Sequence, residues 1–534
     1  MPVEATRTSR IWAAGDLNAF FGLALDNLTN LVLLSGILTA GFGFPPDVIM
    51  KRMIPGTALG VLVGDLVYTW LAVRLARRTG KPGVTAMPLG LDTPSTIGMA
   101  VAVIGPVYVA SGSAEAAWQV GAATLVVMGL VKTALSFCGD RIRRLFPDAS
   151  LLGSIAGVGI ALLGFIPMVE IYGTPLAGMV SLGIVLATLV ARIDLPGRLP
   201  GAFVAIAAGT VVYYAAGAAG VPGPVVEAPD FGLALTPALP TGAWIAGLPG
   251  ALAYLPISVP FGLLTIVGGI NVTQSARLAG DEYETRDVPL TEAAATLVAG
   301  LFGGVAQTTP YIGHPAYKAM GARAGYTLLT AIVVGLGGML GMVSFLVDLL
   351  PAAAVVPVLV FVGLEIVSQA YRVCPDRHAP AITIAFLPVI AYLVLIYMDQ
   401  FAGAIGGMAA AVGEKAPELA GLVVVPERLA GTHATVRKLG NGFIVTSMIW
   451  SAAAALIADR RPARAAIFLA AAAVMTPFGL IHSVRPTGEV YLPWAAGSPA
   501  PLVLAAAYAA TALVLVLIGA VARPVPAGGD GKNP

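Results

Sequence analysis

Polar side chains able to bind a solute or carry a proton lie inside the long apolar stretches of this sequence. Asp26, Asn27 and Asn30 are spaced to share one face of a helix, since residues three and four apart are neighbours there. Asn271 and Gln274 are again three residues apart. Amide groups both donate and accept hydrogen bonds, which fits the edge of a heterocycle. Such groups are costly in a bilayer and indicate a functional site, unless they only hold neighbouring helices together.

The remaining candidates lie in two short segments that contain threonine and proline. The first segment holds Asp92 and Thr93, and the second holds Gln307, Thr308, Thr309, Tyr311 and His314. Asp92 either caps a helix or completes the site. His314 is the one histidine expected at bilayer depth, and it is either a satisfied core residue or a ligand donor or proton carrier that titrates near neutral pH.

These residues, with Asn27, Asn30, Asn271 and Gln274, make up the predicted substrate site. We expect Asn27, Asn271, Gln274, Thr309 and His314 to converge on one cavity, with Asp92 near it. Four ionisable groups are candidates for binding the coupling ion, unless they only pair with neighbouring groups within the fold. They are Asp26, Asp65, His314 and Glu365. The acidic run 281–284 is expected in a solvated cytoplasmic loop.

Both short segments interrupt apolar spans in the same way. Residues 83–110 first indicate extended chain and then a helix start, with Thr93 as cap and a proline at the first helical position. Residues 304–322 repeat this pattern, and there His314 and the proline after it open a short helix. We expect extended stretches near 84–90 and 305–311, each followed by a half-helix.

The spacing of the two breaks predicts an inverted repeat. They fall in the third and tenth spans, and a second set that begins after seven spans inserts upside down. Non-helical backbone survives at bilayer depth only when it is buried in protein or lines a cavity, so matching breaks point to a transporter's binding site. Both half-helices direct positive N-terminal ends at one point, which favours an anionic or acceptor-rich solute. The alternative is two kinked helices with structural prolines.

Composition places all of this in a membrane. The 534 residues are 57% hydrophobic and 11% charged, with a mean hydropathy of +0.87. Soluble domains carry about 25% charged residues. A soluble enzyme, a disordered chain and a nucleic-acid binder are therefore excluded, and the net charge of +2 gives no basic field for nucleic acid.

A ruler of about 20 apolar residues per span gives about sixteen segments, among them 116–136, 251–272, 289–306 and 325–348. The predicted fold class is an all-α polytopic membrane protein. The predicted organisation is a cytoplasmic N-terminus (1–17), a first repeat (18–220), an external connection (221–250), a second repeat (251–458), additional spans (459–522) and a cytoplasmic tail (523–534).

The distribution of Lys and Arg predicts that both termini lie in the cytoplasm. Most of the 30 basic residues then fall at inner ends and loops, Lys132 among them. The exceptions are Lys51, Arg52, Lys415, Arg428, Arg437, Lys438 and Arg485. The first span is expected to direct insertion into the inner, or plasma, membrane. Two cysteines, Cys138 and Cys374, indicate no disulfide framework.

Three stretches resemble the nucleobase–ascorbate transporter family, the xanthine/uracil permeases. They are GVTAMPLGLDTPSTIGMAV at the first break, IVGGINVTQSARLAGDE at 266–282, and LVAGLFGGVAQTTPYIGHPAYKAMGARAGYTLLTA at 297–331. The resemblance implies a seven-plus-seven inverted repeat with a core domain and a gate domain, in which each broken span begins as a short strand. It further implies symport of a nucleobase such as xanthine or uracil, with a proton as the expected coupling ion and sodium as the alternative, and a homodimer.

The sequence departs from this family where members carry acids. The equivalent positions, in the eighth span and at the tenth-span break, fall at Gly268 or Gly269 and at Gly313. Carriers of sulfate, bicarbonate or organic anions share the architecture and are the alternative, and a channel is a third possibility. No enzymatic motif, nucleotide-binding loop, cofactor site or metal-ligand cluster is predicted.

Overall fold

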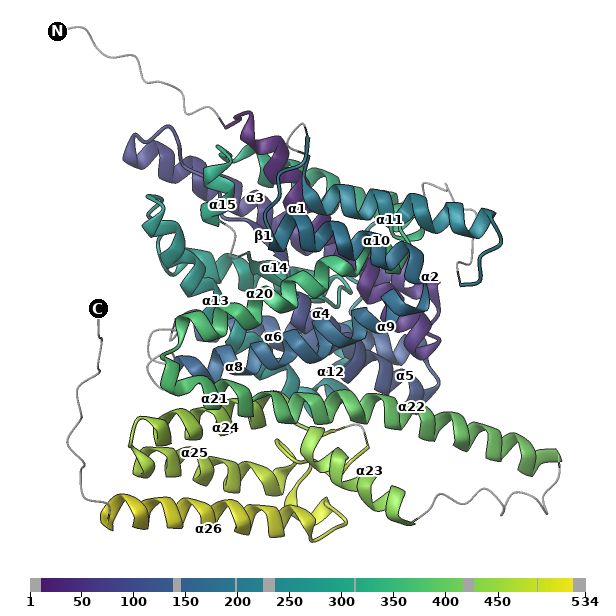
Figure 1. Cartoon of the computed structure of the whole chain (residues 1–534), viewed down its shortest axis with the longest axis vertical. Helices are drawn as coiled ribbons and strands as arrows, with labels where there is room; N and C mark the ends of the chain where they lie inside the picture. The colour runs from purple at the N-terminus through teal and green to yellow at the C-terminus, as the bar shows by residue number, and fades with distance from the viewer. Residues whose placement is uncertain are drawn as a thin grey trace, which may run out of the picture.

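The computed structural model of the chain describes residues 11–137, 146–196, 199–223, 236–311, 314–415, 427–486 and 488–521. Gly313 and Cys138 lie outside these ranges, as does the side chain of Asn271. Within them the chain is a stack of helices around one pair of short strands (Figure 1).

The first half of the chain contains the first strand. Its elements are α1 (Gly15–Gly36), α2 (Pro46–Val48), α3 (Ile54–Thr79), β1 (Leu89–Leu91), α4 (Thr93–Met99), α5 (Gly105–Ser111), α6 (Ala114–Ser136), α8 (Asp148–Val158), α9 (Ile166–Gly173), α10 (Pro175–Val185) and α11 (Gly201–Ala218). A π-helical turn, Ala100–Ile104, joins α4 to α5, and another, Gly159–Phe165, joins α8 to α9.

The second half repeats this order and then extends it. Its elements are α12 (Ala243–Ala251), α13 (Leu255–Leu278), α14 (Asp287–Leu301), β2 (Thr308–Pro310), α15 (His314–Ala319), α16 (Gly325–Thr330), α17 (Gly337–Met339), α18 (Met342–Leu349), α19 (Ala352–Val355), α20 (Pro357–Val373), α21 (Ala379–Ile384), α22 (Phe386–Lys415), α23 (Glu427–Gly440), α24 (Phe443–Ala458), α25 (Pro462–Met475) and α26 (Ala500–Val521).

Ten helices among the described residues are long and apolar enough to cross a membrane, and the bent pair α23–α24 is an eleventh candidate. Two expected boundaries need correction. The span expected at 251–272 begins earlier, because α12 opens at Ala243 inside the segment expected to be an external connection. The span expected at 325–348 is broken at Gly341, whose φ of +78° suits glycine but few other residues.

The two predicted breaks are confirmed as strands. β1 and β2 pair antiparallel, and Gly90 lies opposite Thr309. The flanking bonds from Asp92 N–H to the Gln307 carbonyl (2.9 Å) and from Tyr311 N–H to the Pro88 carbonyl (2.8 Å) extend the ladder by one rung at each end. Both half-helices start near their prolines as expected, but proline is the second residue of α4 and of α15 and not the first.

Helix contacts around this strand pair come in mirrored pairs, which establishes the inverted repeat. α1 packs on β1, α4 and α16, and its counterpart α13 packs on β2, α15 and α6. α3 packs on β1 and α16, and its counterpart α14 packs on β2 and α6. The exchange of partners between halves is what a two-fold relation between the repeats requires. The chain is an all-α polytopic membrane protein with an inverted repeat and two broken spans.

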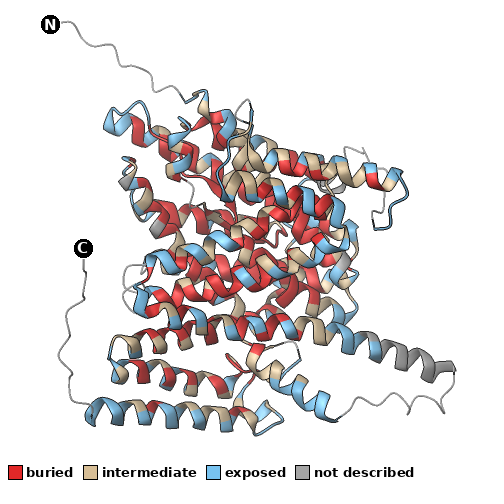
Figure 2. Ribbon diagram, in the orientation of Figure 1, coloured by how far each residue is buried: buried red, intermediate tan, exposed pale blue. Residues whose placement is uncertain are grey.

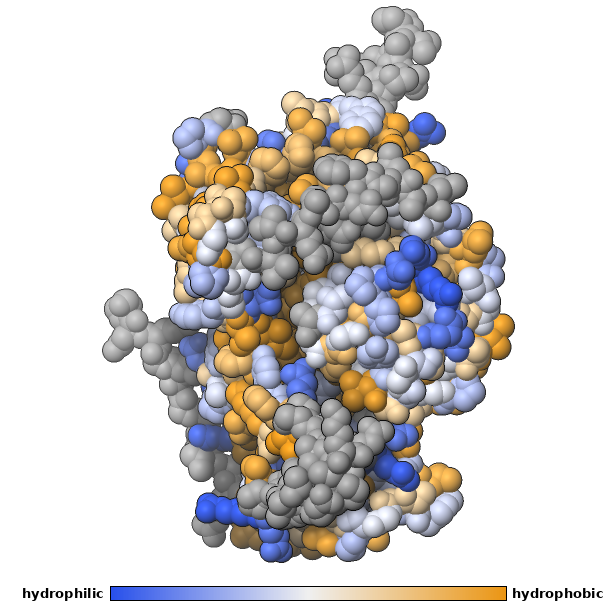
Figure 3. Space-filling view, turned by 90° about the vertical axis from the view of Figure 1, so that its right-hand side faces the viewer, coloured by the Kyte–Doolittle hydropathy of each residue, from blue (hydrophilic) through white to orange (hydrophobic). Residues whose placement is uncertain are grey.

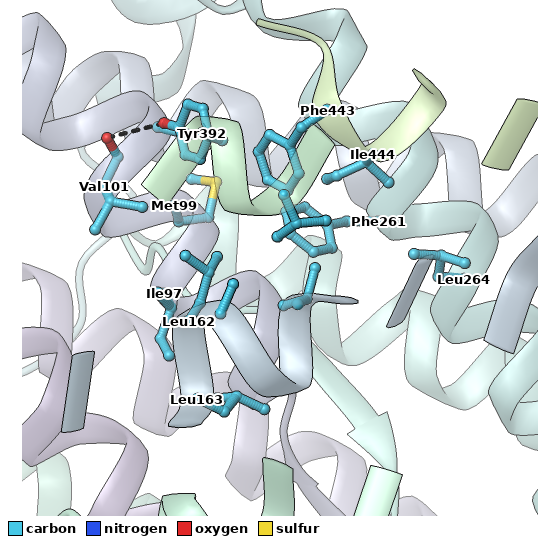
Figure 4. Close-up of a cluster of buried hydrophobic side chains, with 14 of the residues drawn as sticks. Ile97, Met99, Val101, Leu162, Leu163, Phe261, Leu264, Tyr392, Phe443 and Ile444 are labelled. Carbon is cyan, nitrogen blue, oxygen red and sulfur yellow. Dashed lines mark hydrogen bonds between the residues drawn. The ribbon is translucent and has the colours of Figure 1, made fainter. Parts of the chain in front are cut away.

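We call the elements α1–α6 and α12–α17 the core domain and the elements α8–α11 and α18–α24 the gate domain. An apolar layer joins them (Figure 4). From the core, Ile97 and Phe261 reach this layer, and from the gate come Leu162, Tyr392 and Phe443. The Tyr392 and Phe443 rings stack with centroids 4.3 Å apart.

The last two helices lie beyond the gate domain, as the sequence predicts for additional spans. α25 packs on α24, and α26 packs on α25 at the edge of the molecule (Figure 1). Only Pro501 and Ala512 of α26 are buried, whereas more than half of the residues of α1, α3 and α14 in the core domain are buried (Figure 2). On the side of the molecule that carries α2, a hydrophilic patch lies to the right of the middle, with hydrophobic residues to its left and at the right edge (Figure 3).

Candidate functional site

The candidate site is built around the strand pair. Backbone N–H and carbonyl groups at bilayer depth must all find hydrogen-bond partners. Residues Leu91 and Thr308 face each other in the register, yet their N–H and carbonyl groups point away from the partner strand. On the β1 side, Asn27 Oδ1 accepts from the Leu91 N–H at 2.9 Å. The amides of Asn27 and Asn30 also donate to the carbonyls of Leu89 (3.5 Å) and Leu91 (3.4 Å).

The β2 edge is closed by different side chains. Thr296 Oγ1 accepts from the Thr308 N–H at 3.3 Å, and Lys132 Nζ donates to the Thr308 carbonyl at 2.7 Å. Pro310, the residue that follows Thr309 on this strand, has no N–H to satisfy, which is why proline is tolerated at a strand edge.

Asn27 and Asn30 therefore have a structural task that the sequence did not reveal. Both are fully buried and bonded to β1, so their donors are used within the protein. The expectation that Asn27 lines an open cavity is corrected accordingly. Of the side-chain polar atoms of these two asparagines, Asn30 Oδ1 alone lacks a hydrogen-bond partner among the described residues.

The face of the strand pair away from Thr308 and Leu91 is less deeply buried and carries acidic side chains. Gly90 and Thr309 share this face, and a Cβ on Gly90 would lie 3.0 Å from Asp26 Oδ2. Asp26 and Asp92 interact electrostatically, and both are half-buried. In the described part of the chain, no Lys, Arg or His forms an ion pair with either carboxylate.

Asp92, and not Thr93, caps the first half-helix. Its Oδ2 accepts from the Ser95 N–H at 3.0 Å, as N-cap side chains do. Thr93 is instead the first residue of α4 and is buried. The carboxylate thus already occupies the positive end of α4, where the sequence predicted a free anion site.

Gln307 connects Asp92 to a buried ion pair that the sequence analysis missed. Gln307 Nε2 donates to Asp92 Oδ2 at 3.2 Å, and its Oε1 accepts from Lys132 Nζ at 3.3 Å. Lys132 in turn lies 2.6 Å from Glu292 Oε1, and both side chains are fully buried. Lys132 was expected at a cytoplasmic span end, but it lies inside the core domain. The available signal was one charge of each sign within the expected spans 116–136 and 289–306.

Thr308 belongs to the inner face of the strand pair. Its hydroxyl lies 3.2 Å from that of Thr296 and donates to the Glu292 carbonyl at 3.3 Å, and the residue is fully buried. Thr309 is half-buried on the opposite face. The two threonines therefore have separate environments, and Thr309 is the one available to a solute.

His314 belongs to a second cluster. Its Nε2 lies 3.2 Å from the Thr85 carbonyl and 3.3 Å from Asp281 Oδ2, and both partners are acceptors, so Nε2 carries the proton. Asp281 also accepts from the Thr85 N–H at 3.1 Å and lies 2.5 Å from Lys318 Nζ. His314 is thus bonded to the loop before α14 and does not converge with Asn27. Asp281, at 1% exposure, is not part of a solvated loop as expected.

The pKa of Asp281 reflects these contacts. Burial alone would raise it, but hydrogen bonds from His314, Lys318 and the Thr85 N–H, with the Lys318 charge, hold it below the usual value. Asp281 therefore ties α15 to the chain that leads into β1.

The other four predicted residues are spread over the core and gate domains. Asp65 is fully buried on α3, against the backbone of Leu89. Tyr311 is half-buried and interacts electrostatically with Asp26 and with Glu365 of the gate domain. Glu365 is exposed and pairs with Arg372 at 2.9 Å. Gln274 is exposed on α13.

Two cavities lie away from this centre. One of about 420 Å³ is lined by Lys438, Trp450, His482 and Tyr508 of the C-terminal region. The other, of about 390 Å³, lies beside Arg52 and Trp118 at the end that carries α2.

Comparison with known proteins finds no matching family model and no curated relative. Solved structures resemble the chain at low identity. The transmembrane domain of a cyanobacterium bicarbonate transporter, BicA, is 17% identical with a TM-score of 0.47, over 73% of this chain and 96% of that one. SLC26A9 is 12% identical with a TM-score of 0.49, over 72% and 65%. The murine Slc26a9 anion transporter in the inward-facing state is 12% identical with a TM-score of 0.48, over 76% and 69%.

These likenesses are distant, and the fold described above rests on the mirrored contacts of the chain itself. Because no family model and no curated relative matches, the resemblance to nucleobase–ascorbate transporters stays a prediction.

Proposed function

We propose that the chain is a secondary active transporter that moves a small anion together with a cation. The observation that carries this proposal is the pair of carboxylates, Asp26 and Asp92, on the open face of two inverted strands. Matching broken spans at the centre of an inverted repeat are where such carriers bind their solutes.

The carboxylate pair supports cation coupling. Two like charges at bilayer depth with no cationic partner among the described side chains are costly unless a proton or metal cation joins them. Carboxylate and hydroxyl oxygens suit a proton or a hard cation such as sodium. Thr309, opposite Gly90, adds a hydroxyl to the same face.

An anion becomes a favourable solute once that cation is bound. α4 begins beside the strand pair, and its N-terminal end contributes partial positive charge there. Asp92 offsets this charge at α4 while it is ionised and unoccupied. Binding of the cation removes that offset, so cation binding promotes anion binding.

A nucleobase is the second candidate, and one observation favours it. Asp26 and Asp92 are hydrogen-bond acceptors that interact electrostatically, and acceptors match the N–H donors on the edge of a xanthine or uracil ring. The amide of Gln307 is unavailable for this purpose, because its oxygen and nitrogen are both bonded within the protein.

The boundary between core and gate domains suits a sliding motion. Its apolar layer contains one hydrogen bond, from the Tyr392 hydroxyl to the Val101 carbonyl at 3.2 Å, among the residues drawn in Figure 4. Few directional bonds then oppose movement of one domain against the other. We further infer that the carrier works as a homodimer in the plasma membrane, with both termini in the cytoplasm.

Uptake into proteoliposomes tests the proposal. Labelled bicarbonate, sulfate, uracil and xanthine are offered under a sodium gradient, a proton gradient or neither. A cation-coupled anion carrier accumulates an anion only with one of the gradients, and it shows accelerated efflux when unlabelled solute is outside. Accumulation of uracil or xanthine alone favours the second candidate. Flux without counterflow acceleration indicates a channel and overturns both.

A further inference from the structure

Lys132 makes more contacts than an ion pair with Glu292 requires. Its ammonium lies 2.6 Å from Glu292 Oε1 and donates to the Thr308 carbonyl (2.7 Å), Thr296 Oγ1 (3.1 Å) and Gln307 Oε1 (3.3 Å). Replacing a buried ion pair with apolar residues of similar volume is often neutral or stabilising. Stability alone therefore gives no reason for a fully buried lysine here.

The lysine fixes the orientation of the Gln307 amide. An ammonium group only donates, so the amide must turn its oxygen to Lys132. Its nitrogen is then directed at Asp92, where it donates to Oδ2 at 3.2 Å. The Ser95 N–H donates to the same oxygen at 3.0 Å. Both bonds end on Oδ2, and neither uses Oδ1.

We propose that Lys132 is a positioning residue for the coupling cation. Through Gln307 it holds the Asp92 carboxylate by Oδ2, which keeps Oδ1 free as a cation ligand. The connection runs from α14 through α6 and the start of β2 to the cap of α4. This inference rests on the proposed function, in which Asp92 takes the coupling cation.

The test measures the cation concentration that gives half-maximal uptake by the full-length protein in proteoliposomes. Lys132→Met combined with Glu292→Gln removes both charges and leaves no unpaired buried ion. Gln307→Leu removes the connecting amide. Thr133→Ala on the same helix is the matched control, because the Thr133 hydroxyl donates only to the Gly129 carbonyl of its own helix, at 2.8 Å.

Both altered proteins are expected to need roughly tenfold more cation or higher, since each loses a hydrogen bond that orients a charged group. Their maximal uptake at saturating cation stays near that of the wild type. Combining Lys132→Met, Glu292→Gln and Gln307→Leu gives no further rise in the half-saturating cation concentration, because both changes act through the same contact. The Thr133→Ala protein keeps the wild-type value.

Wild-type half-saturation in the Lys132→Met/Glu292→Gln protein overturns the inference, as does a further multiplicative rise in the triple variant. If the Lys132→Met/Glu292→Gln protein does not elute as a single species, the Gln307→Leu protein alone is the test. An unchanged cation requirement in that protein also overturns the inference. If uptake by the wild-type protein does not depend on any cation, the proposed function is overturned, and this inference with it.

Discussion

Glu292 Oε2 lies where a side chain on Gly269 would have to go: a Cβ built there comes within 2.8 Å of it. The carboxylate that the resemblance places on the eighth span is absent from α13, and α14 supplies one to the same space. Lys132 holds the Glu292 carboxylate in this position.

Gly269→Ala is therefore expected to displace the Glu292 carboxylate and destabilise the protein by about 1–3 kcal/mol. The matched control is Gly268→Ala, where nothing lies within 4 Å of the added carbon and the helix gains up to about 1 kcal/mol. Thermal unfolding midpoints in nanodiscs compare the two. Equal midpoints would show that Glu292 moves freely.

Asn27→Ala is expected to destabilise the strand pair. It leaves the Leu91 N–H without its partner at bilayer depth, at a cost of about 1–3 kcal/mol. The control is Thr29→Ala on the same helix, since Thr29 is equally buried but bonds only the Leu25 carbonyl one turn back. Hydrogen exchange at 89–91 should accelerate in the first protein and not in the second.

Two substitutions at Asp92 separate its charge from its role as a helix cap. Asparagine caps helices about as well as aspartate, so Asp92→Asn keeps the structure and removes the charge. Asp92→Ala removes both, and costs about 1 kcal/mol in addition. We expect gradient-driven accumulation to disappear in both proteins, while the unfolding midpoint falls only in Asp92→Ala. Retained accumulation in Asp92→Asn would exclude this carboxylate from coupling.

The Asp281 cluster predicts a loss of stability in acid. The pKa of Asp281 is lower in the folded protein than its unfolded value of about 3.9. Its contribution is therefore present above about pH 4 and is lost as the pH falls through the folded-state pKa. Asp281→Asn should lower the unfolding midpoint at pH 7 and converge with the wild type in acid. Glu282→Gln is the control, because Glu282 is exposed and its ion pair with Lys81 is long, at 3.9 Å.

The breaks were predictable because proline and capping residues act locally. Pro94 and Pro315 suit the start of a helix whatever surrounds them, so the strands and half-helices followed from sequence. The polar residues near the breaks were also recognisable, since hydropathy gives depth along a span. Their partners were not, because partners depend on how helices rotate against one another. Asn27 thus appeared to face a cavity, although it bonds to β1.

Lys132 shows a second limit of sequence reasoning. A lysine four residues before the end of a span is usually able to extend its ammonium to the membrane surface. Only the packing of α6 against α14 turns it inward to Glu292. For His314 the burial was predicted correctly and the partners were not. Thr85 and Asp281, which contact it, come from distant parts of the chain.

The pairing of Gly90 with Thr309 also constrains how the protein is made. More than two hundred residues separate the two strands, and at about 5–20 residues per second the ribosome needs on the order of ten to forty seconds to synthesise them. During that interval β1 has Asn27 and Asn30 on one edge and no strand on the other. The first repeat is thus an unfinished intermediate that membrane quality control can recognise, and a chain truncated before β2 is expected to be degraded rather than to accumulate as a half-transporter.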